Sequence, residues 1–262
     1  MFNLFKAINY QIKKNNLTYI VFLLAVVITA IPFVNSDAGA IQDLNAGLFY
    51  VNFLQPQIFV FMVFNVLMVT GICGFDMKDK TINYEIMTGH SRKAVYFSRV
   101  LMALSWSVLG MVVVTAIPFV ILSVISGWGK EVLFSEFLIR SIVFLFQAIR
   151  LFCFEILLTF LIRSQLATAI LSYFIMDVPV MIGMVFEEFF DIELHYIFAF
   201  YDMMHLSETM NGRNLILDGV EVYRYELALQ PGFAMSSIAT SVIVSAIYVI
   251  VGYVVFCKRD MR

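Results

Sequence analysis

The stretch AVYFSRVLMALSWSVLGMVVVTAIPFVILSVI, residues 94–125, decides the fold class. It is 32 residues long, and Arg99 is its one charged side chain. A bilayer core about 30 Å thick needs about 20 apolar residues of helix. The run therefore predicts a membrane-spanning helix, and because it exceeds one crossing we expect its first turns, around residues 96–99, at the interface or in the cytosol.

Five further runs are long and apolar enough to cross a bilayer: residues 17–34, 57–75, 137–162, 166–186 and 233–257. Backbone groups in lipid must be satisfied within each segment, so these runs predict helices; they lack the alternation of transmembrane β-strands. Residues 1–262 thus form a single all-α domain, a polytopic membrane protein with six transmembrane helices.

Composition supports this class. Hydrophobic residues make up 61% of the chain, the mean hydropathy is +0.90, and charged residues are 14%, against about 25% in a typical soluble domain. This excludes an ordinary soluble enzyme, and a net charge of −2 argues against nucleic-acid binding. The three cysteines, Cys73, Cys153 and Cys257, lie within apolar runs, so neither a disulfide framework nor a metal site is expected.

The distribution of Lys and Arg predicts the orientation. With the N-terminus inside, twelve of these cations fall on the cytosolic side and three, Lys130, Arg213 and Arg224, fall outside. Cytosolic loops carry the excess of positive charge, so both termini are predicted to be cytosolic. Residues 76–93 then form a cytosolic loop, and residues 187–232 form an external segment with nine carboxylates and two arginines.

The N-terminus predicts an amphipathic helix over residues 1–16 that lies in the inner interface. One face carries apolar side chains and the lysines lie mostly opposite: Leu4, Phe5, Ile8 and Ile12 against Lys6, Lys13 and Lys14. A simple extension of the first span is the alternative. A cleaved signal peptide is a further one, but the apolar run exceeds the usual length of such peptides and contains Pro32.

The loop at residues 76–93 is longer than a tight turn needs. Ile82 and Ile86 are four residues apart, with Tyr84 and Glu85 between them. This spacing predicts a short helix that ends near Gly89. Apolar side chains on an exposed loop indicate docking on another protein.

Here the chain resembles the membrane permease subunits of ABC-2-type exporters. That family's first cytosolic loop has an acidic residue, Gly-Thr, a short helix, then Ser-Arg and an aromatic residue, and its C-terminus has Phe, two basic residues and Asp. The matching residues of this chain are Asp76, Asp79, Thr81, 82–87, Ser91, Arg92 and Tyr96, then Phe256, Lys258, Arg259 and Asp260. The chain departs from the pattern at Lys80, where Gly is usual, and at Gly89-His90, where Pro is common.

The resemblance implies that the loop helix couples the permease to a separate ABC ATPase subunit. The residues carried over to this coupling role are Asp79, Thr81, Ile82, Tyr84, Glu85, Ile86, Met87 and Arg92. It also implies two ATPase copies that hold ATP and Mg, a second permease chain (identical or similar), and a bacterial plasma membrane. The substrate would be amphipathic or hydrophobic: a peptide, antibiotic or lipid moved outward.

The chain itself is not expected to be an enzyme or to hold a cofactor. Its one Gly-Lys pair, Gly129-Lys130, has Val124 where the first glycine of a phosphate loop belongs. The sequence also lacks the motifs of zinc or serine intramembrane hydrolases. A secondary transporter or channel remains an alternative, although no internal repeat supports it, and so does a membrane anchor of a regulatory complex.

Four polar residues within the spans are functional candidates, because charges in lipid are costly: Gln147, Arg150, Glu155 and Asp177. The fourth and fifth runs are joined by a very short connection, and counting along each helix places Arg150 and Asp177 at one depth. We therefore predict an Arg150–Asp177 ion pair, with Glu155 opposite Tyr173. Such a pair either fastens two helices or faces the transport route.

The external segment begins with residues 186–201, which combine aromatic and acidic side chains. This favours an interfacial or re-entrant helix over a free loop, and the resemblance implies that such a helix closes the pore on the outside. The acidic balance is explained most simply by carboxylates on a solvated surface, and attraction of a cationic substrate is the alternative. Asn211-Gly212 and Asp218-Gly219 predict turns that flank a small hairpin.

Overall fold

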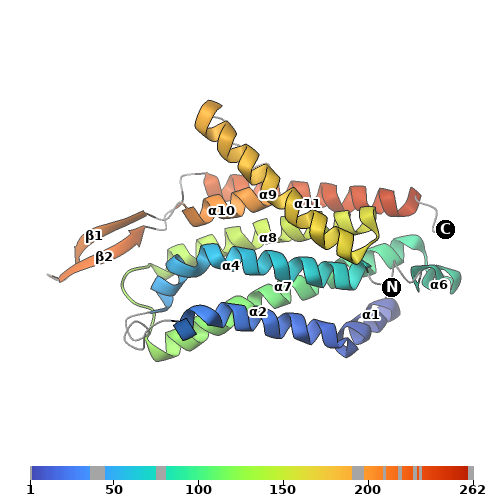
Figure 1. Cartoon of the computed structure of the whole chain (residues 1–262), viewed down its shortest axis with the longest axis horizontal. Coiled ribbons are helices and arrows are strands. Elements are labelled where there is room, and N and C mark those ends of the chain that lie inside the picture. Colours follow the sequence, from blue (N-terminus) through green and yellow to red (C-terminus); the bar gives the residue numbers. More distant parts are fainter. Residues whose placement is uncertain are drawn as a thin grey trace.

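The structure is a computed structural model that describes residues 2–35, 45–74, 81–190, 198–208, 211–217, 220–226, 229 and 232–258. Long helices run alongside one another to form an elongated bundle, with a two-stranded hairpin projecting at one end (Figure 1). The helices are α1 (Phe2–Lys14), α2 (Asn16–Asn35), α4 (Ala46–Val69), α6 (Thr81–Met87), α7 (Arg92–Ile125), α8 (Phe134–Ile162), α9 (Gln165–Phe190), α10 (Ala199–Glu208) and α11 (Phe233–Lys258). The fold is a helical bundle, as predicted.

Five of the six apolar runs lie within one long helix each, and the described part of the run 57–75 covers the C-terminal part of α4 and the π-helical turn that follows it. The largest difference in bounds is at α4, which begins at Ala46 although the apolar run was taken to begin at residue 57. The Asn45 side chain accepts a hydrogen bond from Leu48 N at 2.9 Å and caps this start. Polar residues between the cap and residue 57 lower the hydropathy without ending the helix, which continues into a π-helical turn at Thr70–Gly74.

Three helices, α7, α8 and α11, are long and apolar enough to cross a membrane when the fully described residues are considered. Two shorter apolar stretches, Thr18–Val27 and Met62–Gly74, lie in α2 and at the end of α4. Exposed faces of the bundle carry large apolar side chains such as Leu23, Leu109 and Ile243. An apolar exterior of this kind is compatible with a membrane protein.

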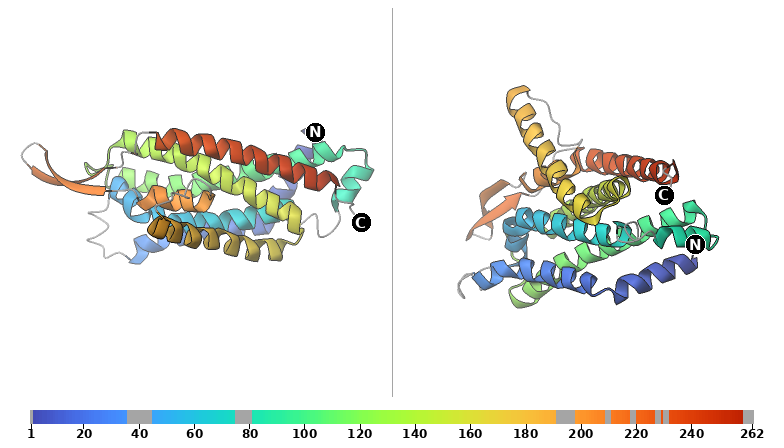
Figure 2. Two further views of the ribbon diagram at one scale, coloured as in Figure 1. Left: turned by 90° about the horizontal axis from the view of Figure 1, so that it is seen from above. Right: turned by 45° about the vertical axis from the view of Figure 1, so that its right-hand side comes forward.

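α8 is the central helix, because it packs against α4, α7, α9, α10 and α11. Its most extensive packing is with α11. Buried charged side chains concentrate on it, including Arg140, Arg150 and Glu155. Buried charged side chains therefore lie within a core that is otherwise largely apolar. The C-terminal end of α9 stands away from its neighbours (Figure 2).

The N-terminal amphipathic helix is confirmed. α1 is separate from α2 and angled against it, with Asn15 between them (Figure 1). Leu4, Ile8 and Ile12 are buried while all three lysines are exposed. Trp106 of α7 donates a hydrogen bond from Nε1 to Asn9 Oδ1 at 3.2 Å, so α1 docks on the bundle as a distinct element rather than extending the first span.

The two ends of the bundle carry different elements. Both termini and α6 lie together at one end, and the hairpin lies at the other (Figure 1). Residues expected to be external fold partly back onto the bundle, because α10 packs against α4, α8 and α9. Residues 186–201 are predicted to contain an interfacial or re-entrant helix. In the structure residues 186–190 end α9, α10 begins at Ala199, and residues 191–197 lie outside the described part.

A hairpin is present, but it is not flanked by the two predicted turns: its strands lie on either side of residues 218–219. Strands β1 (Asn211–Leu217) and β2 (Val220–Glu226) pair antiparallel, with Leu217 opposite Val220. Asn211-Gly212 was expected to be a turn but forms the start of β1, opposite Glu226 and Tyr225. Cross-strand pairing satisfies its backbone groups, so this Asn-Gly pair is not needed as a turn. Residues 218–219 lie outside the described part.

Hydrogen bonds attach the short loop between α7 and α8 to the start of α4. Asn45 donates from Nδ2 to Glu131 Oε2 at 2.8 Å, and Gly47 N donates to Trp128 O at 3.0 Å. Gly129 lies between these contacts with φ +87°, and a Cβ atom there would overlap the Asn45 and Glu131 side chains.

Gly129→Ala should therefore destabilise the protein by about 1–2 kcal/mol from left-handed backbone strain alone. The overlap with the Asn45 and Glu131 side chains adds to that loss. Gly127 is the matched control, because its φ is +75° while nothing lies within 4 Å of its Cβ position. Thermal unfolding in detergent should rank Gly129→Ala clearly below Gly127→Ala. Equal midpoints for the two variants would mean that the Asn45–Glu131 contact is not formed.

Candidate functional site

The first candidate site is a polar cluster in the interior of the bundle. On α8, residues 140, 147 and 150 recur at the helical period and lie on one face. Across from them lies Asp202 of α10, and the first turns of α11 complete the cluster with Ser237. Each of these side chains is fully buried.

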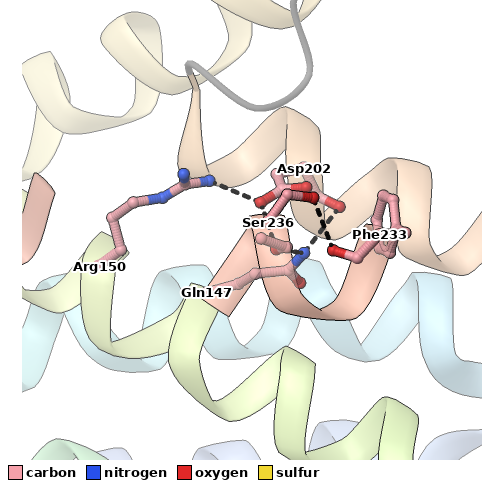
Figure 3. Close-up of polar contacts among 6 residues, drawn as sticks. Gln147, Arg150, Asp202, Phe233 and Ser236 are labelled. Carbon is pink, nitrogen blue, oxygen red and sulfur yellow. Dashed lines mark hydrogen bonds and ion pairs between the residues drawn. The ribbon is translucent and has the colours of Figure 1, made fainter. Parts of the chain in front are cut away.

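Asp202 is the centre of the cluster. Arg150 donates from an Nη atom to Asp202 Oδ2 at 2.9 Å, and Ser237 Oγ donates to the same oxygen at 2.9 Å. Gln147 Nε2 donates to the Asp202 carbonyl at 3.3 Å and to Ser237 Oγ at 3.0 Å. Figure 3 shows Arg150 and Gln147 pointing toward Asp202 from α8. The cluster therefore joins three helices through one buried carboxylate.

A second arginine fixes the other end of α10. Arg140 donates from an Nη atom to the Leu206 carbonyl at 2.6 Å, and Arg140 is fully buried. Carbonyls in the last turn of a helix have no partner within the helix and favour a cation. α10 is thus held at its middle by Arg150 and at its C-terminal turn by Arg140.

The partner that the structure gives Arg150 is Asp202, which the sequence analysis placed in the external segment and did not single out. The Asp177 side chain lies outside the described part, so the predicted Arg150–Asp177 pair stays a prediction. The depth argument compared only two adjacent helices, whereas the partner comes from a helix that folds back 52 residues later. An acid between aromatic and Met residues, Asp202 in the stretch 199–204, was the available signal.

The predicted partner of Glu155 is wrong. Tyr173 is 49% exposed, and Glu155 instead accepts a hydrogen bond from Asn65 Nδ2 of α4. Glu155 follows Arg150 by five residues, which at 3.6 residues per turn rotates it about 140° away from the Asp202 cluster. It therefore faces α4 rather than α9 or α10, and the signal that was missed is one polar residue, Asn65, inside an apolar run.

The second candidate site is α6, which confirms the predicted short helix. Gly89 follows it with φ +96°. His90 N donates to Glu85 O at 3.2 Å, and Gly89 N donates to Ile86 O at 3.0 Å. These two bonds form a Schellman cap, which glycine favours because it adopts a left-handed backbone without strain. Ser91 then caps α7 by accepting from Ala94 N at 3.2 Å.

The inner face of α6 is anchored to the bundle. Ile82 is buried and Ile86 is half-buried. Glu85 forms an ion pair with Arg99 of α7 at 2.8 Å, in which Arg99 is fully buried and the Glu85 side chain is 24% exposed. Arg99, expected at the interface or in the cytosol, thus lies beneath α6 and fixes it.

The outer face of α6 is apolar and open. Tyr84 is 67% exposed and Met87 is 80% exposed. Arg92, from the start of α7, donates to the carbonyl of Cys257 at 2.8 Å and so links this region to the end of α11. The Thr81 side chain and the whole of Asp79 lie outside the described part. Among the described side chains of the expected coupling residues, Tyr84 and Met87 are the large apolar ones that are exposed.

Across the described residues, no group of three or more His, Cys, Asp or Glu side chains is arranged to hold a metal ion. No protein-family model matches the chain, and the comparison with curated proteins finds no match.

Proposed function

We propose that this chain is the permease subunit of an ATP-driven ABC exporter. The observation that carries the proposal is the geometry of α6: a seven-residue helix, anchored by Ile82 and the Glu85–Arg99 pair, presents Tyr84 and Met87 outward. A rigidly anchored helix with an exposed apolar face suits a surface that receives force from a partner.

The location of α6 supports the same proposal. It lies at the end of the bundle that also holds both termini, and the Lys and Arg bias supports a cytosolic position for that end, where ATP is available. In this proposal the six long helices α2, α4, α7, α8, α9 and α11 all cross the membrane of a bacterial cell. α1 lies in the inner interface.

In this proposal ATP hydrolysis takes place on separate subunits and not on this chain. Two ATPase subunits bind ATP and Mg, each docking on α6 of one of two permease chains. The permease changes between inward and outward access because the ATP-bound partner binds those states with different affinity. The substrate is an amphipathic or hydrophobic molecule that leaves the cell. α10, fastened inside the outer half by Arg150 and Arg140, closes the route on the outside.

The experiment is copurification of the tagged chain with an ATP-binding subunit encoded beside it, in gentle detergent. Tyr84→Ala combined with Met87→Arg should reduce the recovered ATPase at least tenfold while leaving the unfolding midpoint of the permease unchanged, since both side chains are solvent-exposed. Tyr10→Ala is the matched control, because Tyr10 is 66% exposed on α1 at the same end. Equal recovery with all three proteins would contradict docking through α6.

Glu85 is a poor site for that test. Its carboxylate faces Arg99, so Glu85→Arg brings two cations together and displaces α6 itself. Loss of the partner with that variant would report a moved helix rather than a lost contact.

A further inference from the structure

The contact between Asn65 of α4 and Glu155 of α8 gives a fully buried carboxylate an amide partner and no cation among the described residues. Asn65 Nδ2 donates to Glu155 Oε2, and both residues are fully buried. Glu155 Oε1 and Asn65 Oδ1 have no hydrogen-bond partner among the described residues. One contact therefore leaves two buried oxygens of the same pair unsatisfied.

Two ion pairs among the described residues show that buried or half-buried carboxylates elsewhere in the bundle have an arginine partner, which Glu155 lacks. Asp202 lies 2.9 Å from a guanidinium nitrogen of Arg150, and Glu85 lies 2.8 Å from one of Arg99. No cation pairs with Glu155 within the described part of the chain. An ionised carboxylate at such a position would combine a buried unpaired charge with two unsatisfied acceptors, each of which is costly.

A single added proton removes the unpaired charge and also satisfies the two buried oxygens. A proton on Glu155 Oε1 removes the charge, and the resulting O–H supplies a donor for the Asn65 carbonyl oxygen. The amide and the carboxylic acid then exchange two hydrogen bonds, as complementary donor–acceptor groups do. The ionised form has no arrangement in which Asn65 Oδ1 gains a donor from Glu155.

We propose that Glu155 and Asn65 form a proton-binding site, in which Glu155 is held as a neutral carboxylic acid in a cyclic pair with the Asn65 amide. The site joins α4 to α8 five residues before the π-helical turn Thr70–Gly74, which also packs against α8 and α9. π-Helical turns often mark functional positions. This inference does not depend on the partner ATPase, so it stands or falls separately from the proposed function.

The test is infrared spectroscopy of the purified chain in lipid at neutral pH, which separates the carbonyl absorption of a carboxylic acid from that of a carboxylate. The difference spectrum between the wild-type chain and Glu155→Gln should contain a carboxylic-acid band. Glu188→Gln is the matched control, because Glu188 is an exposed glutamate on α9, and its difference spectrum should lack the carboxylic-acid band.

A second variant keeps Glu155 in place in case Glu155→Gln does not fold. Asn65→Leu removes the amide partner, so the acid band should persist and move to higher frequency as its carbonyl loses the Asn65 N–H donor. A carboxylate band instead of an acid band in the Glu155→Gln difference, or the absence of any acid band that responds to Asn65→Leu, would overturn the proposal.

Discussion

Arg150→Met should destabilise the protein by about 3–5 kcal/mol, the range expected when one partner of a buried ion pair is removed. The variant leaves Asp202 ionised, fully buried and next to an apolar side chain. Ser237 still donates to the same Asp202 oxygen, but a neutral hydroxyl does not compensate the carboxylate charge. Thermal unfolding in detergent measures the loss.

The double variant Arg150→Met/Asp202→Leu should recover much of that stability. It removes both charges together, and replacing a whole buried pair by apolar residues is often neutral. A double variant no more stable than Arg150→Met alone would mean that the two side chains do not interact. Arg92→Met is a control, because Arg92 donates to a backbone carbonyl from an exposed position and leaves no acid unpaired.

Gly110→Leu should have the second large effect. Gly110 lies on α7 where three helices meet, and a Cβ atom there would overlap the ring of Phe64 of α4 and lie 3.2 Å from Phe22 Cζ of α2. The Phe22 and Phe64 rings already pack edge to face with centroids 5.1 Å apart. Overpacking of a filled core costs about 1–3 kcal/mol, and occasionally more.

A double-mutant cycle with Phe64→Ala locates the cause. Shortening Phe64 vacates the space that the leucine needs, so the double variant should be more stable than the sum of the two single effects predicts. Gly71→Leu provides the control, since nothing lies within 4 Å of its Cβ position. Strict additivity of Gly110→Leu and Phe64→Ala would contradict the close approach of α4 and α7.

The sequence predicted the helices well because the lipid-facing sides of a bundle must be apolar whatever the details of packing. α7 and α11 show this: their exposed faces carry Leu109, Val120 and Ile250, and hydropathy alone marked both runs. The α6 helix was predictable for a different reason. The residues that predicted it, Ile82, Ile86 and Gly89, lie within two helical turns of one another, so no contact distant in the sequence was needed.

The polar partners were not predictable in the same way. Arg150 and Asp202 are 52 residues apart, and Asn65 and Glu155 are 90 apart. Depth along a helix can be counted from sequence, but the rotation of one helix against another depends on packing across the whole bundle. α10 adds a helix that a count of spans leaves out, and it supplies the partner of Arg150.

The most direct test of the central claim is native mass spectrometry of the tagged chain, released from the membranes of its own cells. The proposal predicts an assembly of two permease chains and two ATP-binding subunits, with ATP hydrolysis that depends on the ATPase subunits. A stable permease without any ATP-binding partner would contradict it and would favour a channel, a secondary transporter or a membrane anchor.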